Sequence, residues 1–189
     1  MDRISQLPEP ILQHILSFLL VEDAARMSTL SKIWTSAWNS LSYLNFGDNL
    51  FHNNNNQEDL PNLLKGVTQI LAKRHNQKIS VQKFSLQLPY WRRRCYYLHK
   101  WINLLVACNI KELNLRVSKT IYQGRREHCK LPEVIFNAKA LNVLNLNGFK
   151  IELPSNGCTM KLSSLRELHL CNVSLDEKLC KVYAQAATI

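Results

Sequence analysis

Apolar residues near the start of the chain recur with the period of a helix. Ile11, Leu12, Ile15, Leu16 and Leu19 fall at positions i, i+1, i+4, i+5 and i+8, so they lie on one wide face of a helical segment. The spacing therefore predicts an amphipathic helix whose apolar face packs against other parts of the protein or against a partner.

Two more short helices are predicted before residue 46. Glu22 and Asp23 are acids placed to begin a second helix near its positively charged end. Ser28 is positioned to cap a third helix, in which Leu30 and Trp34 are separated by a four-residue step. A unit of about 45 residues is too small to bury much surface alone. Its apolar surface is therefore expected to continue into a partner or into the following domain.

A different apolar pattern begins at residue 81 and repeats. The pattern apolar-x-x-apolar-x-apolar occurs four times, with starts separated by 29, 31 and 24 residues, a spacing close to that of leucine-rich repeats. The alternation at the end of each motif predicts a short strand with its apolar side chains facing inward. The four motifs are Val81-Phe84-Leu86, Ile110-Leu113-Leu115, Leu141-Leu144-Leu146 and Leu165-Leu168-Leu170.

Segments between these motifs have the apolar spacing of helices. Residues 98–107 and 132–138 are predicted to form helices that cover the opposite side of a solenoid. The alternative is an ordinary α/β domain with similar strands. The 31 leucines, against 9 valines, favour the repeats, because each inward position of a solenoid fills an interior shared with its neighbours.

Asparagines and acids separate the two patterned regions. Residues 47–62 contain four consecutive asparagines and little to bury, so they are predicted to be a linker. The expected organisation is a helical domain over residues 1–46, this linker, a repeat domain over 63–182 and a tail over 183–189. The expected fold class is α plus α/β.

Composition excludes several classes of protein. The 189 residues are 46% hydrophobic, which excludes wholesale disorder. There is no run of about 18 apolar residues to span a membrane, and no basic start followed by an apolar core to indicate a secretory signal. Six cysteines without a CxxC pair indicate reduced thiols rather than a disulfide scaffold or a zinc site. An intracellular protein of the cytoplasm or nucleus, without a membrane partner, is therefore expected.

No catalytic residue, metal or cofactor is predicted. The chain contains no P-loop, GxGxxG, GxSxG or HExxH pattern. His128 adjoins Cys129 and His99 lies four residues after Cys95, but no further ligand is near either pair. These pairs are interpreted as incidental, so a binding protein is expected rather than an enzyme.

Positive charge is concentrated in the middle of the chain. Of the net charge of +10, residues 65–130 carry +13, from 15 Lys or Arg against two acids. The simplest interpretation is a set of solvated loops and helix faces, while an acidic protein, an anionic surface or nucleic acid are alternative partners. The three arginines at 92–94 are followed by Tyr96 and Tyr97, but no RNA-recognition, zinc-finger or helix-turn-helix pattern surrounds them.

The N-terminal residues resemble the F-box family. Residues 7–19 (LPEPILQHILSFL) resemble its opening helix, and residues 21–25 (VEDAA) and 30–34 (LSKIW) are similar to its second and third helices. Two positions depart from the family pattern, since Leu20 replaces a frequent proline and Ile33 replaces the arginine usual in plant members. Neither departure removes a residue from the apolar face.

The resemblance implies a docking function. F-box modules bind the Skp-type adaptor of SCF cullin–RING ubiquitin ligases, so the chain would reach the cullin and RING subunits indirectly. Leu30 and Trp34 are expected to hold the three helices together and to reach the adaptor at its rim. The other residues implied to face the adaptor are Leu7, Pro8, Ile11, Leu12, Ile15 and Leu16.

Residues 63–182 resemble the leucine-rich segment of plant F-box/LRR proteins, including those of the FBD type. The likeness is carried by residues 81–86 (VQKFSL), 109–115 (NIKELNL) and 165–170 (LRELHL). It implies a solenoid of about four repeats that binds a target protein for ubiquitination, while other subunits transfer the ubiquitin. The face expected to favour an acidic target comprises Lys83, Arg92, Arg93, Arg94, Arg116, Arg125 and Arg126.

The chain stops earlier than members of this family usually do. Residues 177–187 are expected either to form a makeshift capping helix or to belong to a truncated receptor. The sequence supports two hypotheses of function: a substrate receptor of an SCF ligase, and a basic nucleic-acid- or anion-binding protein without ligase association. Nucleic acid is the weaker of the two, because no recognition pattern supports it.

Overall fold

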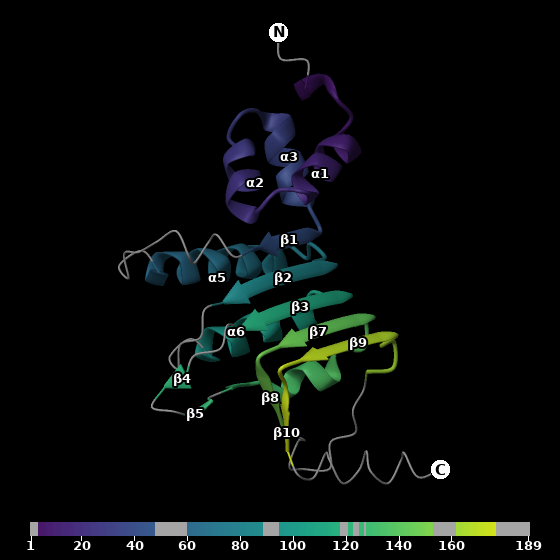
Figure 1. Ribbon diagram of the computed structural model, residues 1–189. Coiled ribbons are helices and arrows are strands. Elements are labelled where there is room, and N and C mark those ends of the chain that lie inside the picture. Colours follow the sequence, from purple (N-terminus) through teal and green to yellow (C-terminus); the bar gives the residue numbers. More distant parts are fainter. Residues whose placement is uncertain are drawn as a thin grey trace.

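Three short helices form the N-terminal end of the protein (Figure 1). The computed structural model describes residues 4–47, 60–88, 95–117, 121–122, 125–126, 128–152 and 162–176. Together with a preceding 3-10 turn, the three helices are called the helical unit. Its elements are η1 (Ile4–Gln6), α1 (Glu9–Ser17), α2 (Val21–Met27) and α3 (Lys32–Ser40).

The third helix begins later than the sequence predicts. Ser31 is its N-cap, since the Ser31 hydroxyl accepts a 3.5 Å hydrogen bond from the backbone N–H of Trp34. Ser28, the predicted cap, ends α2 and donates its hydroxyl to the carbonyl of Ala25 at 2.6 Å. The prediction for Ser28 is wrong because two serines lie within one turn, and the sequence alone does not reveal which one faces the free N–H groups.

A parallel sheet of five strands follows the helical unit (Figure 1). The strand order is β1-β2-β3-β7-β9, and every neighbouring pair is parallel. The last four strands lie at the four predicted motifs. The bounds are β1 (Tyr43–Phe46), β2 (Lys83–Leu88), β3 (Glu112–Val117), β7 (Val143–Asn147) and β9 (Glu167–Cys171).

The first strand, β1, lies outside the four predicted motifs. Its sequence nevertheless repeats them, since Leu41, Leu44 and Phe46 stand at the same spacing and all three are buried. The segment that follows α3 therefore supplies the first strand of the sheet, with no break in the described chain between them.

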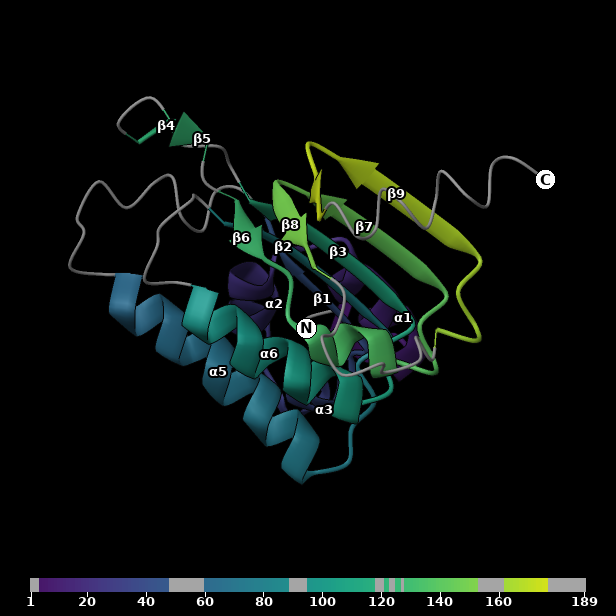
Figure 2. The same ribbon diagram turned by 90° about the horizontal axis from the view of Figure 1, so that it is seen from below.

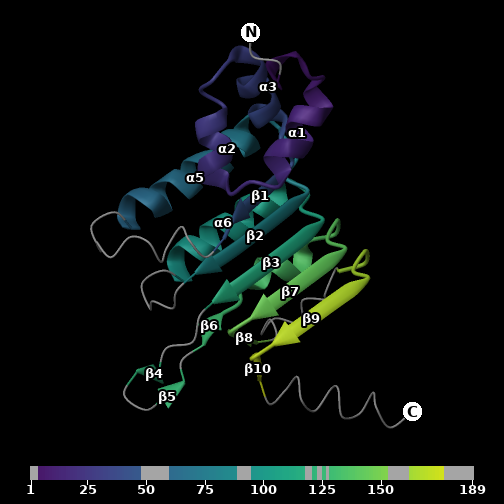
Figure 3. The same cartoon turned by 45° about the horizontal axis from the view of Figure 1, so that its top comes forward.

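Helices cover one face of the sheet (Figure 2). The segment predicted as a helix over residues 98–107 lies in α6, whereas residues 132–138 contain a 3-10 helix rather than an α-helix. Within the described residues the other face carries no helix (Figure 3). The expected mixed α and α/β architecture is confirmed. The covering elements are α5 (Leu60–Asn76), α6 (Cys95–Ala107) and η3 (Glu133–Asn137).

Short strands lie beyond the main sheet. Three of them form a second parallel sheet in the order β10-β8-β6, and two others form an antiparallel pair. Gly148 joins β7 to β8 with φ of 86°, and a Cβ there would overlap the carbonyl oxygen of Val117, so glycine is required. The bounds are β4 (Ile121–Tyr122), β5 (Arg125–Arg126), β6 (Cys129–Lys130), β8 (Phe149–Ile151) and β10 (Ser174–Leu175).

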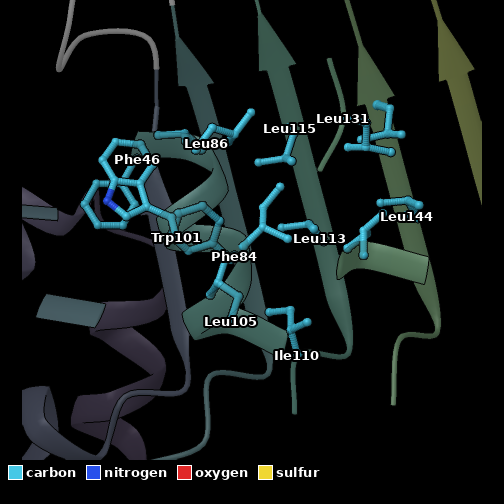
Figure 4. Packing of buried hydrophobic residues seen from close by; sticks show 14 of the residues in the cluster. Phe46, Phe84, Leu86, Trp101, Leu105, Ile110, Leu113, Leu115, Leu131 and Leu144 are labelled. Carbon is cyan, nitrogen blue, oxygen red and sulfur yellow. The ribbon is translucent and has the colours of Figure 1, made fainter. Parts of the chain in front are cut away.

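Inward-facing side chains of the strands form rows, and those of β1, β2, β3 and β7 make the core (Figure 4). Trp101 and Leu105 of α6 pack against these rows, and Trp101 Nε1 donates to Thr68 Oγ1 of α5 at 2.9 Å. The rows explain the leucine excess, because each unit must fill the interior that it shares with the next. In register, the first row is Leu44, Phe84, Leu113, Leu144 and Leu168, and the second is Phe46, Leu86, Leu115, Leu146 and Leu170.

The residue just ahead of the strands repeats one hydrogen-bonding arrangement. The carbonyl of Gln82 accepts the backbone N–H groups of both Lys111 and Glu112, at 2.9 and 2.8 Å. The carbonyls of Ser42, Lys111 and Asn142 likewise each accept two N–H groups from the next unit along the chain. Both lone pairs of one carbonyl thus hold each following unit in register.

A buried arginine ties the helical unit to α5. Arg74 donates from Nη1 to the carbonyl of Leu41 and from Nη2 to the carbonyl of Trp38 at 3.0 Å, and its guanidinium lies 5.4 Å from the Trp38 ring centre. Carbonyl groups at the end of a helix lack partners within the helix and favour a nearby cation. Burial lowers the pKa of Arg74 to about 10, so the side chain is still charged at neutral pH.

Candidate functional sites

Large apolar side chains are exposed on the helical unit. Phe18, at the end of α1, is 73% exposed and Leu30, in the turn before α3, is 63% exposed. Ile4, Ile11 and Ile33 are exposed as well. Apolar surface left in water is a free-energy cost that a partner can remove, so the helical unit is a candidate protein-docking surface.

The residues predicted to face the adaptor differ in their exposure. Pro8, Ile11 and Leu30 are exposed. Leu7 and Ile15 are half-buried against the core of the helical unit. These five side chains can contact a partner without any change in the fold.

Three other predicted residues lie inside the helical unit. Leu12, Leu16 and Trp34 are buried in one cluster with Ala24 and Ala37. They hold α1, α2 and α3 together and support the surface residues from below. Leu30, expected to hold the helices together with Trp34, does not do so, because it is 63% exposed and lies outside this cluster. Sequence periodicity does not separate these buried residues from the exposed ones, because both kinds lie on one broad apolar face.

Sequence reasoning misses two exposed residues of the helical unit, Phe18 and Ile33. Ile11 and Phe18 are separated by seven residues along α1, which is close to two helical turns. These two exposed side chains therefore lie on one side of α1, apart from its buried residues. This seven-residue spacing is the signal that could have identified Phe18.

A groove of about 770 Å³ lies on the sheet face that the helices leave uncovered. Most of its lining comes from alternate, outward-pointing residues of all five strands, with Leu20 and Gly47 at the side of the helical unit. The inward-facing Leu86, Leu115 and Leu146 form its floor between them. This surface is called the open sheet face, and its side chains are mostly neutral and polar. Its amide residues are Asn45, Gln87, Asn114, Asn145 and Asn147.

The strand register arranges the open sheet face in rows. Asn114 and Asn145 are register partners, and Asn145 Nδ2 donates to Asn114 Oδ1. In the next row, Arg116 lies between its register partners Gln87 and Asn147. Arg116 is exposed and has no hydrogen bond or ion pair with any residue that the structure describes. It is therefore an uncommitted cation beside neutral amides.

The predicted basic face is not assembled as one surface by the described residues. Lys83 lies on the open sheet face, but its Nζ is 2.9 Å from a carboxylate oxygen of Glu112, and this hydrogen bond raises the pKa of Lys83. Arg125 and Arg126 belong to β5, which pairs with β4 away from the main sheet (Figure 1). The arginines at 92–94 lie outside the described residues.

Glu152 joins two further lysines at the end of β8. Its carboxylate oxygens lie 2.7 Å from Nζ of Lys130 and 2.8 Å from Nζ of Lys150. Hydrogen bonds from the two ammonium groups lower the pKa of Glu152 to about 2 and raise the pKa of both lysines. These two cations are consequently less available to an anionic partner.

Chemistry-bearing clusters are scarce in the part of the chain that the structure describes. That part holds no group of three or more His, Cys, Asp or Glu placed to bind a metal ion, and none of its helices has the length and apolar character needed to cross a membrane. Cys108 and Cys171 are free thiols, as expected. The expectation of reduced thiols is wrong for Cys129, which is disulfide-bonded.

Two family models match the chain at the regions just described. The model of the F-box domain matches residues 4–46, which are the helical unit and β1. A second model, described as FBD-associated F-box protein At5g56370, LRR repeats, matches residues 98–182. The resemblance read from the sequence motifs is thereby confirmed. No solved structure matches the chain.

Curated relatives come from Arabidopsis thaliana. A putative F-box/FBD/LRR-repeat protein is 36% identical over 172 residues, which cover 89% of this chain and 36% of that protein. An F-box/LRR-repeat protein is 30% identical over 173 residues, covering 91% of this chain and 52% of the relative. An F-box/FBD/LRR-repeat protein is 31% identical over 186 residues, which cover 96% of this chain and 39% of that protein. The chain spans about a third to a half of the length of these relatives.

Proposed function

We propose that this chain, which belongs to the F-box/leucine-rich-repeat proteins, is a non-catalytic substrate receptor of an SCF-type cullin–RING ubiquitin ligase. Its helical unit docks on a Skp-type adaptor, which links it to the cullin and RING subunits. Its repeats bind a target protein. The observation that carries the proposal is the set of exposed apolar side chains on the unit that matches the F-box model.

The proposal assigns the domains as the sequence predicts. Residues 1–46 form a three-helix F-box, 47–62 a linker, 63–182 a short solenoid of about four repeats, and 183–189 a tail. The strand β1 at the end of the first segment serves as the base on which the repeats stack. The protein works in the cytoplasm or the nucleus, where its adaptor complex would be found.

Adaptor binding is divided between contact residues and supporting residues. Pro8, Ile11 and Leu30 make contact through exposed side chains, and Leu7 and Ile15 contribute their accessible edges. The buried residues Leu12, Leu16 and Trp34 act by keeping the helices in place. Removing a contact residue should therefore weaken docking alone, whereas removing a supporting residue should also weaken the fold.

The mechanism is proximity rather than chemistry on this chain. A receptor that binds adaptor and target together raises the local concentration of target lysines near the ubiquitin-carrying enzyme. The Arg74 contacts support this role, since they join α5 to the end of α3 and limit swivelling between the two binding regions.

Adaptor co-purification tests the proposal. We expect the double substitution Ile11→Asp with Leu30→Asp to reduce retention of a plant Skp-type adaptor by more than tenfold, because hot-spot side chains contribute about 2 kcal/mol or more each. Tyr96→Asp is the matched control, since Tyr96 is an exposed large side chain on α6. Circular dichroism checks that all variants are folded. Undiminished adaptor retention by the double variant would contradict the assignment.

Leu7→Ala with Pro8→Ala tests the start of the same surface. We expect it to abolish adaptor co-purification while the rest of the chain stays folded, because one residue is half-buried and the other exposed. A folded double variant that retains the adaptor at the original level would exclude these two residues from the interface.

The net charge of +13 over residues 65–130 supports a second candidate function, binding to nucleic acid or another polyanion. A gel shift with nonspecific DNA that falls steeply with salt, together with no adaptor retention, would favour this candidate. The pairing of Lys83 with Glu112, and of Lys130 with Glu152, counts against it, because paired cations release fewer counterions.

A further inference from the structure

We propose that the groove on the open sheet face binds an extended, acidic segment of a target protein, and that Arg116 holds one carboxylate of this segment. The inference rests on the proposed function, because it specifies the class of target that the repeats would present. Of the seven residues of the predicted basic face, the inference assigns target binding to Arg116, which lies among amide side chains.

Arg116 is the cation best placed to act on the open sheet face. Lys83, the lysine that the structure places on this face, is held by Glu112 at 2.9 Å. Arg116 is exposed and has no bonded partner among the described residues, so no ion pair must break before a ligand binds. Its planar guanidinium can bind both oxygens of a carboxylate through two parallel hydrogen bonds.

The amides beside Arg116 suit the remainder of a peptide. Gln87 and Asn147 flank Arg116 in the same row, where their NH₂ groups can donate to the carboxylate's free lone pairs. Asn114 and Asn145 in the adjacent row bond to each other through one N–H and one oxygen. Since each primary amide has two N–H groups and an acceptor oxygen, this pair still has groups for the N–H and C=O of a peptide backbone.

The shape of the groove favours an extended segment over a compact small molecule. Its lining comes from outward residues of five neighbouring strands, so it is a broad, open surface. Small-molecule sites commonly bury about 70–90% of the ligand, which an open sheet face does not achieve. A polynucleotide is also disfavoured as the ligand, because binding it needs several cations that contact phosphates. His169, in the row next to that of Arg116, does not add a free cation, since its Nε2 lies 3.6 Å from the carboxylate of Glu167.

Retention on immobilised peptide pools tests this inference with the full chain. Each pool holds nine-residue peptides with Glu, Gln or phosphoserine fixed at the centre and no other acidic residue. We expect the Glu pool to retain the protein roughly tenfold better than the Gln pool, as a charge-assisted bidentate contact requires. Arg116→Gln should bring this ratio close to one.

Lys100→Gln is the matched control, because it removes the same charge from an exposed position on α6, on the helix-covered side. It should leave the ratio between the Glu and Gln pools unchanged. Equal retention of the two pools by the original protein, or a ratio that survives Arg116→Gln, would overturn the inference. A preference for phosphoserine over Glu would also overturn it, by assigning the groove to phosphopeptides.

Adaptor retention by the same preparations separates this inference from the proposed function. Arg116→Gln should retain the adaptor fully, because Arg116 lies on the sheet and outside the helical unit. A Glu preference without adaptor binding would support the groove and reject the ligase role. Adaptor binding without a preference for the Glu pool would support the ligase role and reject the groove as a site for acidic segments.

Discussion

The two edges of the main sheet carry the same sequence motif in different surroundings. Leu44 of β1 is 0% exposed, while Leu168, at the equivalent position of β9, is 47% exposed. Phe46 and Leu170 differ in the same way, at 2% and 42%. At the β1 edge, α1 and α2 contact the strand and Val21 joins its core, whereas the described residues place no element beyond β9.

The comparison shows that a repeat motif does not determine its own burial. A leucine in a solenoid is buried by the units on both sides, so a terminal unit needs a cap of another kind. The helical unit is that cap for β1, in addition to its proposed docking role. The docking surface and the first repeat are therefore parts of one packed structure, which can be tested by weakening each edge in turn.

The largest expected effect is the difference between the two equivalent leucines. Leu44→Ala should lower the free energy of unfolding by about 3 kcal/mol, because it leaves a cavity among fully buried neighbours. Leu168→Ala should lower it by less than about 1 kcal/mol, since half of that side chain is already in water. Urea denaturation of both variants measures the difference. Equal losses would show that β9 is covered as well as β1.

A smaller effect is expected at the contact that fixes the cap. Arg74→Ala should lower the free energy of unfolding by about 2 kcal/mol, because it removes two hydrogen bonds and takes the guanidinium from the Leu41 carbonyl, while the Trp38 carbonyl keeps the N–H of Leu41. Lys73→Ala is the control, since exposed Lys73 makes only a 3.4 Å hydrogen bond to Asn39. In Arg74→Ala, but not in Lys73→Ala, the β1 amides should exchange hydrogen almost as fast as the β9 amides do. Slow exchange in β1 would mean that the cap holds without Arg74.

The smallest effect concerns acid stability near the edge strands. The pKa of Glu152 falls from 4.5 to about 2 on folding, because Lys130 and Lys150 stabilise its charged form. The resulting stability is present above pH 4.5 and is lost as the pH falls toward about 2. Glu152→Gln should therefore reduce the acid-dependent loss of stability over that range, measured by urea midpoints at each pH.

Glu22→Gln is the control for the pH experiment. Glu22 is an exposed acid on α2 and has no ion pair with any residue that the structure describes. Glu22→Gln should leave the fall of the urea midpoint between pH 4.5 and about 2 as steep as in the original protein. An identical change in both variants would show that the loss reflects total charge rather than the two lysine contacts.

The strands were predictable because their pattern is local. Each motif carries its apolar residues within six positions, and the register of Phe84 with Leu113 and Leu144 follows from aligning the motifs. The same alignment could have revealed β1 and the polar position between its apolar residues. Asn45, Asn114 and Asn145 occupy this position in three strands, so the amide character of the open sheet face is also encoded locally.

The position of Arg74 could not be predicted because its partners are distant in the chain. Its two acceptor carbonyls lie 33 and 36 residues earlier, and an arginine in a basic segment is expected to face water. The neighbours Ile11 and Leu12 pose a similar problem in the helical unit. Both are apolar and adjacent, yet only Leu12 is buried, and only the packing of α1 against α3 decides which.

The strand order has a consequence for how the chain can assemble during synthesis. Among the described residues, the order of strands across the main sheet is their order along the chain, so each strand pairs with the nearest earlier and nearest later strand of that sheet. A nascent chain leaving the ribosome can add each strand to an edge that is already in place, without waiting for a distant segment. The helical unit and β1 emerge before the other strands of this sheet, so they supply the template from which this growth starts.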